Sequence, residues 1–123
     1  YRDIRTEQNN ESSADMRDRI VRARQIQKLR YEGSGIYTNS EMGIRQIRRF
    51  CSLRDEDEAF LQQIFSRLGL SARGCHKILK VARTLADLEG KEQIERTHLM
   101  EAAGYRDLQE RYWGKEAADD VPN

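Results

Sequence analysis

Apolar positions recur at three- and four-residue steps in several separate segments, which is the spacing of amphipathic helices. The most regular segment covers residues 70–89, where one apolar stripe consists of Cys75, Ile78, Leu79, Ala82, Leu85 and Ala86. Gly69 and Gly90 flank it and are suited to end helices, and Ser71 is a strong N-cap. We therefore predict a central, capped helix whose stripe faces a core.

The same period predicts four more helices, over about residues 12–31, 40–51, 55–68 and 96–106. Asp55 to Glu58 form an acidic first turn, which suits the helix dipole. The positions expected to face inward in these helices and their connections are Met16, Ile20, Ala23, Ile26, Leu29, Ile36, Tyr37, Ile44, Ile47, Phe50, Cys51, Phe60, Leu61, Ile64, Phe65, Leu68, Ile94, Leu99, Ala102, Ala103 and Tyr105. Since no segment alternates like a strand, we predict an all-α bundle of five helices.

The length of 123 residues fits one small domain. Residues 1–11 are polar without a clear period and are expected to be a linker, residues 12–106 the helical domain, and residues 107–123 a flexible tail. No apolar run is long enough to span a membrane and no signal peptide is visible, so we expect a cytoplasmic protein without a membrane partner.

The formal net charge is only +1, which excludes a strongly basic nucleic-acid binder by net charge alone. The distribution is uneven, because residues 1–54 hold 12 Lys/Arg and 7 Asp/Glu whereas residues 55–123 hold 10 and 14. The side of the first helix expected to face solvent carries Arg17, Arg19, Arg22, Arg24, Lys28 and Arg30. Two interpretations stay open, a solvated helix face or a nucleic-acid surface formed by Arg17, Arg24, Lys28, Arg45 and Arg48.

Candidate catalytic chemistry is sparse. Cys51 and Cys75 fall within predicted helices and lack metal-ligand spacing with His76 or His98, so we predict core thiols in a reducing compartment and no metal site. The stretch from Gly69 to Gly74 has the glycine spacing of a phosphate-binding loop, but a cysteine and a histidine follow where Lys-Ser/Thr is required. We therefore expect no catalytic residues and no catalysis by this chain alone.

Arg73 is unusual because it places a cation in the first turn of the central helix, at a cost of about 0.3–1 kcal/mol from the helix dipole. It begins a row with Lys77, Lys80 and Thr84 opposite the apolar stripe. Spacing leaves two interpretations, a solvated arginine or an arginine that binds an anion such as phosphate together with free backbone N–H groups.

Four segments in order suggest a family: SSADMRDRIVRARQIQ, TNSEM, LGLSARGCHKILKVARTLADLEG and IERTHLMEAAGYR. Together they resemble the C-terminal domain of the magnesium-chelatase-like AAA+ ATPases of the ComM type, from about Glu11 to Arg106. The third segment is the most specific, and the others add order and spacing.

This resemblance implies that the chain is the helical lid that follows an AAA+ ATPase core. Arg73, the arginine of the L-S-x-R element, would then be the sensor 2 residue, with Ser71 and Lys77 as auxiliary phosphate contacts. The core, with its Walker motifs, would lie upstream of Tyr1 and would bind ATP with Mg. The implied partners are that core, the neighbouring subunits of a hexameric ring, and DNA acted on by the parent.

The chain departs from the family pattern at two positions. Cys75 stands where relatives commonly carry a bulky aromatic residue, and Lys77 stands where many carry Arg, whose bidentate fork a Lys lacks. Three functions remain open: the lid of a motor acting on DNA in recombination or competence, the lid of a magnesium chelatase motor in tetrapyrrole synthesis, and an autonomous basic DNA-binding module.

Overall fold

The computed structural model describes residues 12–109, with side chains described as far as Gly104. Within this range the chain is all-α, as predicted, and its elements are α2 Ser13–Arg30, the 3-10 turn η1 Asn39–Glu41, α3 Ile44–Phe50, α4 Asp55–Leu68, α5 Ala72–Leu88 and α6 Arg96–Gln109. Helix α6 continues three residues past its predicted end. The expectations for residues 1–11, for residues 110–123 and for the Tyr105 side chain lie outside this description.

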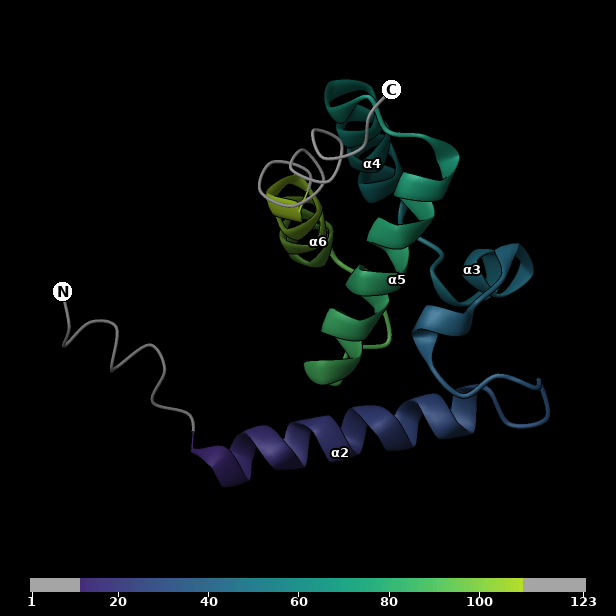
Figure 1. The fold of residues 1–123 in the computed structure, drawn as a ribbon, viewed down its shortest axis with the longest axis vertical. Helices are drawn as coiled ribbons and strands as arrows, with labels where there is room; N and C mark the ends of the chain where they lie inside the picture. The colour runs from purple at the N-terminus through teal and green to yellow at the C-terminus, as the bar shows by residue number, and fades with distance from the viewer. Residues whose placement is uncertain (1–11, 110–123) are drawn as a thin grey trace, which may run out of the picture.

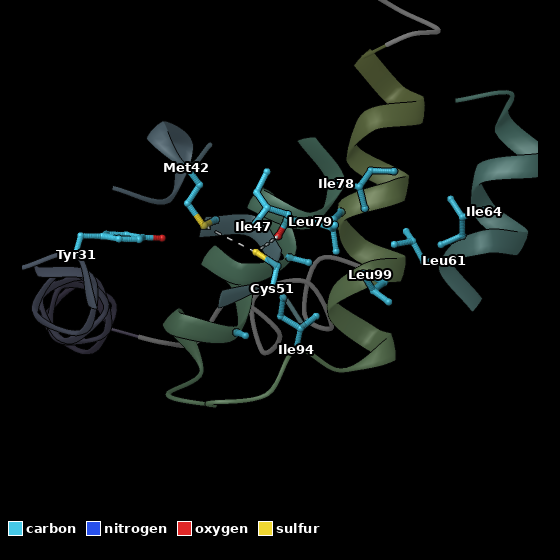
Figure 2. Close-up of a cluster of buried hydrophobic side chains, with 13 residues drawn as sticks. Tyr31, Met42, Ile47, Cys51, Leu61, Ile64, Ile78, Leu79, Ile94 and Leu99 are labelled. Carbon is cyan, nitrogen blue, oxygen red and sulfur yellow. Dashed lines mark hydrogen bonds between the residues drawn. The ribbon is translucent and has the colours of Figure 1, made fainter. Parts of the chain in front are cut away.

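Helix α5 is the centre of the molecule (Figure 1). It packs on α2, η1, α3 and α6, and α4 packs on α6. Its predicted stripe is confirmed, because Ile78, Leu79, Ala82 and Ala86 are buried and Cys75 and Leu85 are half-buried. Figure 2 shows Ile78 and Leu79 of this stripe in one apolar core with Leu61 of α4, Leu99 of α6 and Ile94 of the connection before α6.

The second predicted helix is split in two, and this corrects the sequence prediction. Gly43 separates η1 from α3 in an extended conformation (φ −87°, ψ −179°), and its N–H donates to Gln46 Oε1 at 2.7 Å. Thr38 caps η1, with its N–H donating to Glu41 Oε1 at 3.2 Å. Because the chain turns at Gly43, Ile44 is exposed instead of buried.

Helix α2 is less buried than its apolar pattern predicts. Ser12 caps it, accepting from the Asp15 N–H at 3.0 Å, but Ala23 is its only fully buried residue. Met16 and Ile20 lie on the same face as Ala23 and are 49% and 38% exposed, because the first turns of α2 extend past α5 (Figure 1). The other residues predicted inward but found exposed are Leu29, Tyr37, Phe65 and Leu68.

A buried ionic cluster joins α2 to α5. Arg30 donates from Nη1 and Nη2 to the two Asp87 carboxylate oxygens at 2.8 and 2.7 Å. Asn39 donates to Asp87 at 2.9 Å and to Thr84 at 3.0 Å, and it accepts from the Tyr31 hydroxyl. Arg30 was predicted to face solvent and does not. Burial acts to lower its pKa, but the hydrogen bond and charge of Asp87 outweigh burial and raise that pKa.

Arg83 extends the same cluster toward the rest of the bundle. Its Nε donates to Asp87 at 3.2 Å, one helical turn away. Its Nη atoms donate to the backbone carbonyls of Phe50 at 3.2 Å, Glu92 at 2.7 Å and Lys91 at 2.6 Å. One buried side chain thereby holds the end of α3 and the connection between α5 and α6 against α5.

We expect Asp87→Ala to lower the free energy of unfolding by about 3–5 kcal/mol, because it leaves two guanidiniums buried without their carboxylate. Urea unfolding followed by circular dichroism measures this loss. A variant without a cooperative transition would be unfolded already, which is a larger destabilisation of the same kind. Glu101→Ala, which removes an exposed carboxylate from α6, is the matched control. Equal midpoints for the two variants would contradict the role given to Asp87.

The Cys51 thiol provides a second test of the core. It is buried beside Met42 Sδ at 4.0 Å and the Leu79 carbonyl at 3.8 Å (Figure 2), and burial raises its pKa to about 11. In a Cys75→Ser variant at pH 8, we expect iodoacetamide to alkylate Cys51 only after urea unfolds the chain. Rapid alkylation of the folded protein would show that the thiol is accessible.

The same pKa shift makes stability depend on pH. The folded state keeps the Cys51 proton up to about pH 11, whereas the unfolded thiol releases it at lower pH. The contribution of the thiol is therefore fully present at neutral pH and is lost as pH rises toward 11.

Candidate functional site

The candidate site is the N-terminal end of α5, which a tight turn places directly after α4. Gly69 ends α4 in the left-handed region (φ 62°, ψ 41°), and the Leu70 N–H donates to the Phe65 carbonyl at 3.1 Å. Ser71 then caps α5, since its Oγ accepts from the Gly74 N–H at 3.1 Å. The predicted cap is thus confirmed.

Arg73 lies in the first turn of this capped helix and is exposed to solvent. Among the described residues, its guanidinium makes no hydrogen bond or ion pair, and no acidic side chain lies in this first turn. The Ser71 cap occupies the Gly74 N–H, while the N–H groups of Ala72 and Arg73 bond to nothing in the described part of the chain. A cation and two unused donors at the positive end of the dipole form a surface suited to an anion.

The row that begins with Arg73 divides into two parts. Thr84 is half-buried, where it accepts from Asn39 and donates to the Lys80 carbonyl at 3.1 Å. Lys80 Nζ donates to the Ser40 carbonyl at 3.1 Å. Only Arg73 and Lys77 of this row are fully exposed, one turn apart, so the row as a whole is not a solvent face.

The five residues of the possible nucleic-acid surface are all exposed, but they lie on two helices. Arg17, Arg24 and Lys28 form one stripe along α2 at spacings of seven and four residues. Arg45 and Arg48 belong to α3, which packs on α5. The structure gathers the first three into one surface and leaves the other two apart from it.

Sequence reasoning missed the role of His98, which is 1% exposed at the start of α6. Its Nδ1 accepts from the Glu95 N–H at 2.9 Å, which assigns the proton to Nε2, 2.9 Å from Glu89 Oε1. His98 thus accepts the hydrogen bond that a Glu or Gln side chain accepts in a capping box. Its position, three residues into the helix, could have indicated this role. His98 is therefore a structural residue.

The described part of the chain holds neither a metal site nor a membrane-spanning helix. No group of three or more His, Cys, Asp or Glu side chains converges there to hold a metal ion. No helix in the same range combines the length and the apolar content that crossing a membrane requires.

Comparisons with known proteins identify the relatives of this chain. A family model described as "Magnesium chelatase, subunit ChlI C-terminal" matches residues 10–106. The competence protein ComM of Haemophilus influenzae is 46% identical over 96 residues, which is 78% of this chain and 18% of that protein. The uncharacterized proteins YifB of Salmonella typhimurium and Escherichia coli are 40% and 41% identical over the same shares. No solved structure matches.

Removing the cap tests the local geometry of the site. We expect Ser71→Ala to destabilise the fold by about 1 kcal/mol, because the Gly74 N–H loses its acceptor. Ser66→Ala, at an exposed position within α4, should cause no loss. Thermal unfolding of both variants checks this, and equal stability would show that the hydroxyl does not hold the first turn of α5.

Proposed function

The chain belongs to the magnesium chelatase subunit ChlI C-terminal family, and from that membership we propose that it is the helical lid of a magnesium-chelatase-like AAA+ ATPase. It spans 18% of the length of the relatives that it matches, so the ATPase activity proposed here is that of a parent protein with a separate core. The observation that carries the proposal is the exposed Arg73 at the capped N-terminus of α5, free of any carboxylate in the described residues.

The proposed mechanism is electrostatic. When the core binds ATP with Mg, Arg73 pairs with a phosphate oxygen in a poorly hydrated site and acts as the sensor 2 residue. The unused N–H groups beside it and the Ser71 cap support the same anion. Loss of that phosphate removes the charge that holds Arg73, and the lid rotates. Lys77 adds charge one turn away but cannot form a bidentate pair.

The names of the relatives favour DNA over a chelatase partner as the target of the motor. The relative that is 46% identical is named a competence protein, so we propose a motor that acts on DNA in competence or recombination as part of a hexameric ring. The alternative is a chelatase motor in tetrapyrrole synthesis, which the description of the family itself suggests. Neighbouring genes of recombination or of tetrapyrrole synthesis distinguish the two.

Arg73→Ala in the full-length parent should reduce kcat for ATP hydrolysis at least about tenfold, because the charge that responds to the phosphate is gone. Arg73→Lys should restore only part of the rate, since it keeps the charge and loses the fork. Arg22→Ala, at an exposed position on α2, is the matched control. Normal ATPase kinetics for Arg73→Ala would overturn the assignment.

The same substitution in this chain controls for folding. Arg73 makes no hydrogen bond or ion pair with the described residues and opposes the helix dipole, so Arg73→Ala should leave the thermal unfolding midpoint unchanged or slightly raised. A lowered midpoint would instead indicate a structural role.

A further inference from the structure

An open groove lies between the C-terminal half of α2 and the loop of residues 31–38, far along the chain from Arg73. Its volume is about 1070 Å³, and its apolar lining includes Leu29, Ile36 and Tyr37. Leu29 is 73% exposed and Tyr37 is 77% exposed, more than any other large hydrophobic residue described. A large apolar surface that is held open in this way is typical of a binding site.

The loop that forms one wall is fixed by hydrogen bonds of its own. The Ser34 N–H and hydroxyl both donate to the Tyr31 carbonyl, at 2.9 and 2.6 Å, and Tyr31 itself is buried. The Tyr37 N–H donates to Glu41 Oε1 at 3.3 Å. Because the wall is already ordered, a ligand would bind without a large cost for ordering the loop.

The charges beside the groove favour carboxylates. Arg24 and Lys28 line it, and Arg17 continues their stripe along α2. Among the side chains that the structure describes, residues 12–104, no carboxylate lies at ion-pair distance from any of these three cations. Glu32 is the one acidic residue in the lining, beside two cations, and the aliphatic side chains of the lining disfavour a phosphate backbone. The groove thus fits a peptide with an apolar anchor followed by acidic residues.

The C-terminal part of this chain has that composition. Tyr112 and Trp113 are followed by Glu116, Asp119 and Asp120, all outside the described residues. The distances between the aromatic and acidic residues of this segment also agree with the distances between Leu29 and the cations of α2. In an extended peptide Asp119 lies about 20 Å beyond Trp113, while along α2 Arg17 lies about 18 Å before Leu29. Glu116 lies about 10 Å from Trp113, and Arg24 lies about 7.5 Å from Leu29.

We propose that the groove binds the C-terminal segment of a second copy of this chain. Trp113 packs against Leu29 and Tyr37, and the carboxylates that follow it pair with the cations of α2. The segment of the same copy is badly placed, because α6 ends across α5 from the groove (Figure 1). The link from Gln109 to Trp113 spans at most about 14 Å.

This contact is heterologous, since the C-terminal segment of one copy meets the groove of another, and repeated contacts of this kind build a ring where the rotation closes and an open filament where it does not. The groove contact does not require Arg73 to sense nucleotide, so a result against one proposal leaves the other unaffected. In this contact, the carboxylates that follow Trp113 are the partners of Arg17, Arg24 and Lys28.

Trp113 is the only tryptophan in the chain, so its fluorescence reports the contact directly. We expect its emission to shift to shorter wavelength as protein concentration rises, together with an increase in sedimentation coefficient. Leu29→Ser and Tyr37→Ser should each weaken association about tenfold or more, as expected for anchor residues. Ile44→Ser, at an exposed apolar position on α3, is the matched control and should change nothing.

Exchanging the charges on the two sides tests whether the cations of α2 pair with the carboxylates of the C-terminal segment. Arg24→Glu with Lys28→Glu should weaken association at least about tenfold, and adding Glu116→Lys with Asp119→Lys to the same chain should restore most of it. Three results would overturn the proposal: solvent-like Trp113 emission at all concentrations, a blue shift that does not depend on concentration, or an unchanged shift in Leu29→Ser.

Discussion

The carboxylate of Asp87 is the constraint on which the rest of this fold depends. It is 2% exposed and accepts hydrogen bonds from Arg30, Arg83 and Asn39. A carboxylate and two guanidiniums stay buried only while they pair with one another. Any arrangement of α2, η1 and α5 that separates these groups leaves charges unpaired away from water. The apolar core holds the helices together, and this cluster specifies how they are arranged.

The cluster and the candidate site occupy opposite ends of α5. Asp87 follows Arg73 by 14 residues, which corresponds to about 21 Å along the helix axis. The C-terminal half of α5 carries the buried polar contacts, whereas its N-terminal end holds an exposed cation that makes no hydrogen bond or ion pair with the described residues. The groove lies near the cluster, because Tyr31 lines the groove and donates to Asn39 of the cluster. Arg73 and the groove could therefore act at the same time without competing for the same surface.

Much of the fold could be predicted from the sequence, because helical period, caps and glycines are local signals. The stripe of α5, the Ser71 cap and the Gly69 turn all follow from neighbouring residues. The Asp87 cluster could not be predicted, since charged residues at helical spacing usually face water and only the fold brings Arg30, 57 residues away, to Asp87. Likewise, the pattern of α2 shows an apolar face but not how far α5 covers it, so Met16 and Ile20 were wrongly expected to be buried. Composition and spacing alone left the role of Arg73 open, and the family resemblance indicated it.

We propose that α5 presents Arg73 to a nucleotide held by another domain of the parent protein. A structure of the full-length parent with a non-hydrolysable ATP analogue and Mg would test this most directly. We expect the Arg73 guanidinium to lie within hydrogen-bond distance of a phosphate oxygen, with the Ser71 cap still formed. An Arg73 side chain that points into solvent while the nucleotide site is occupied would contradict the account.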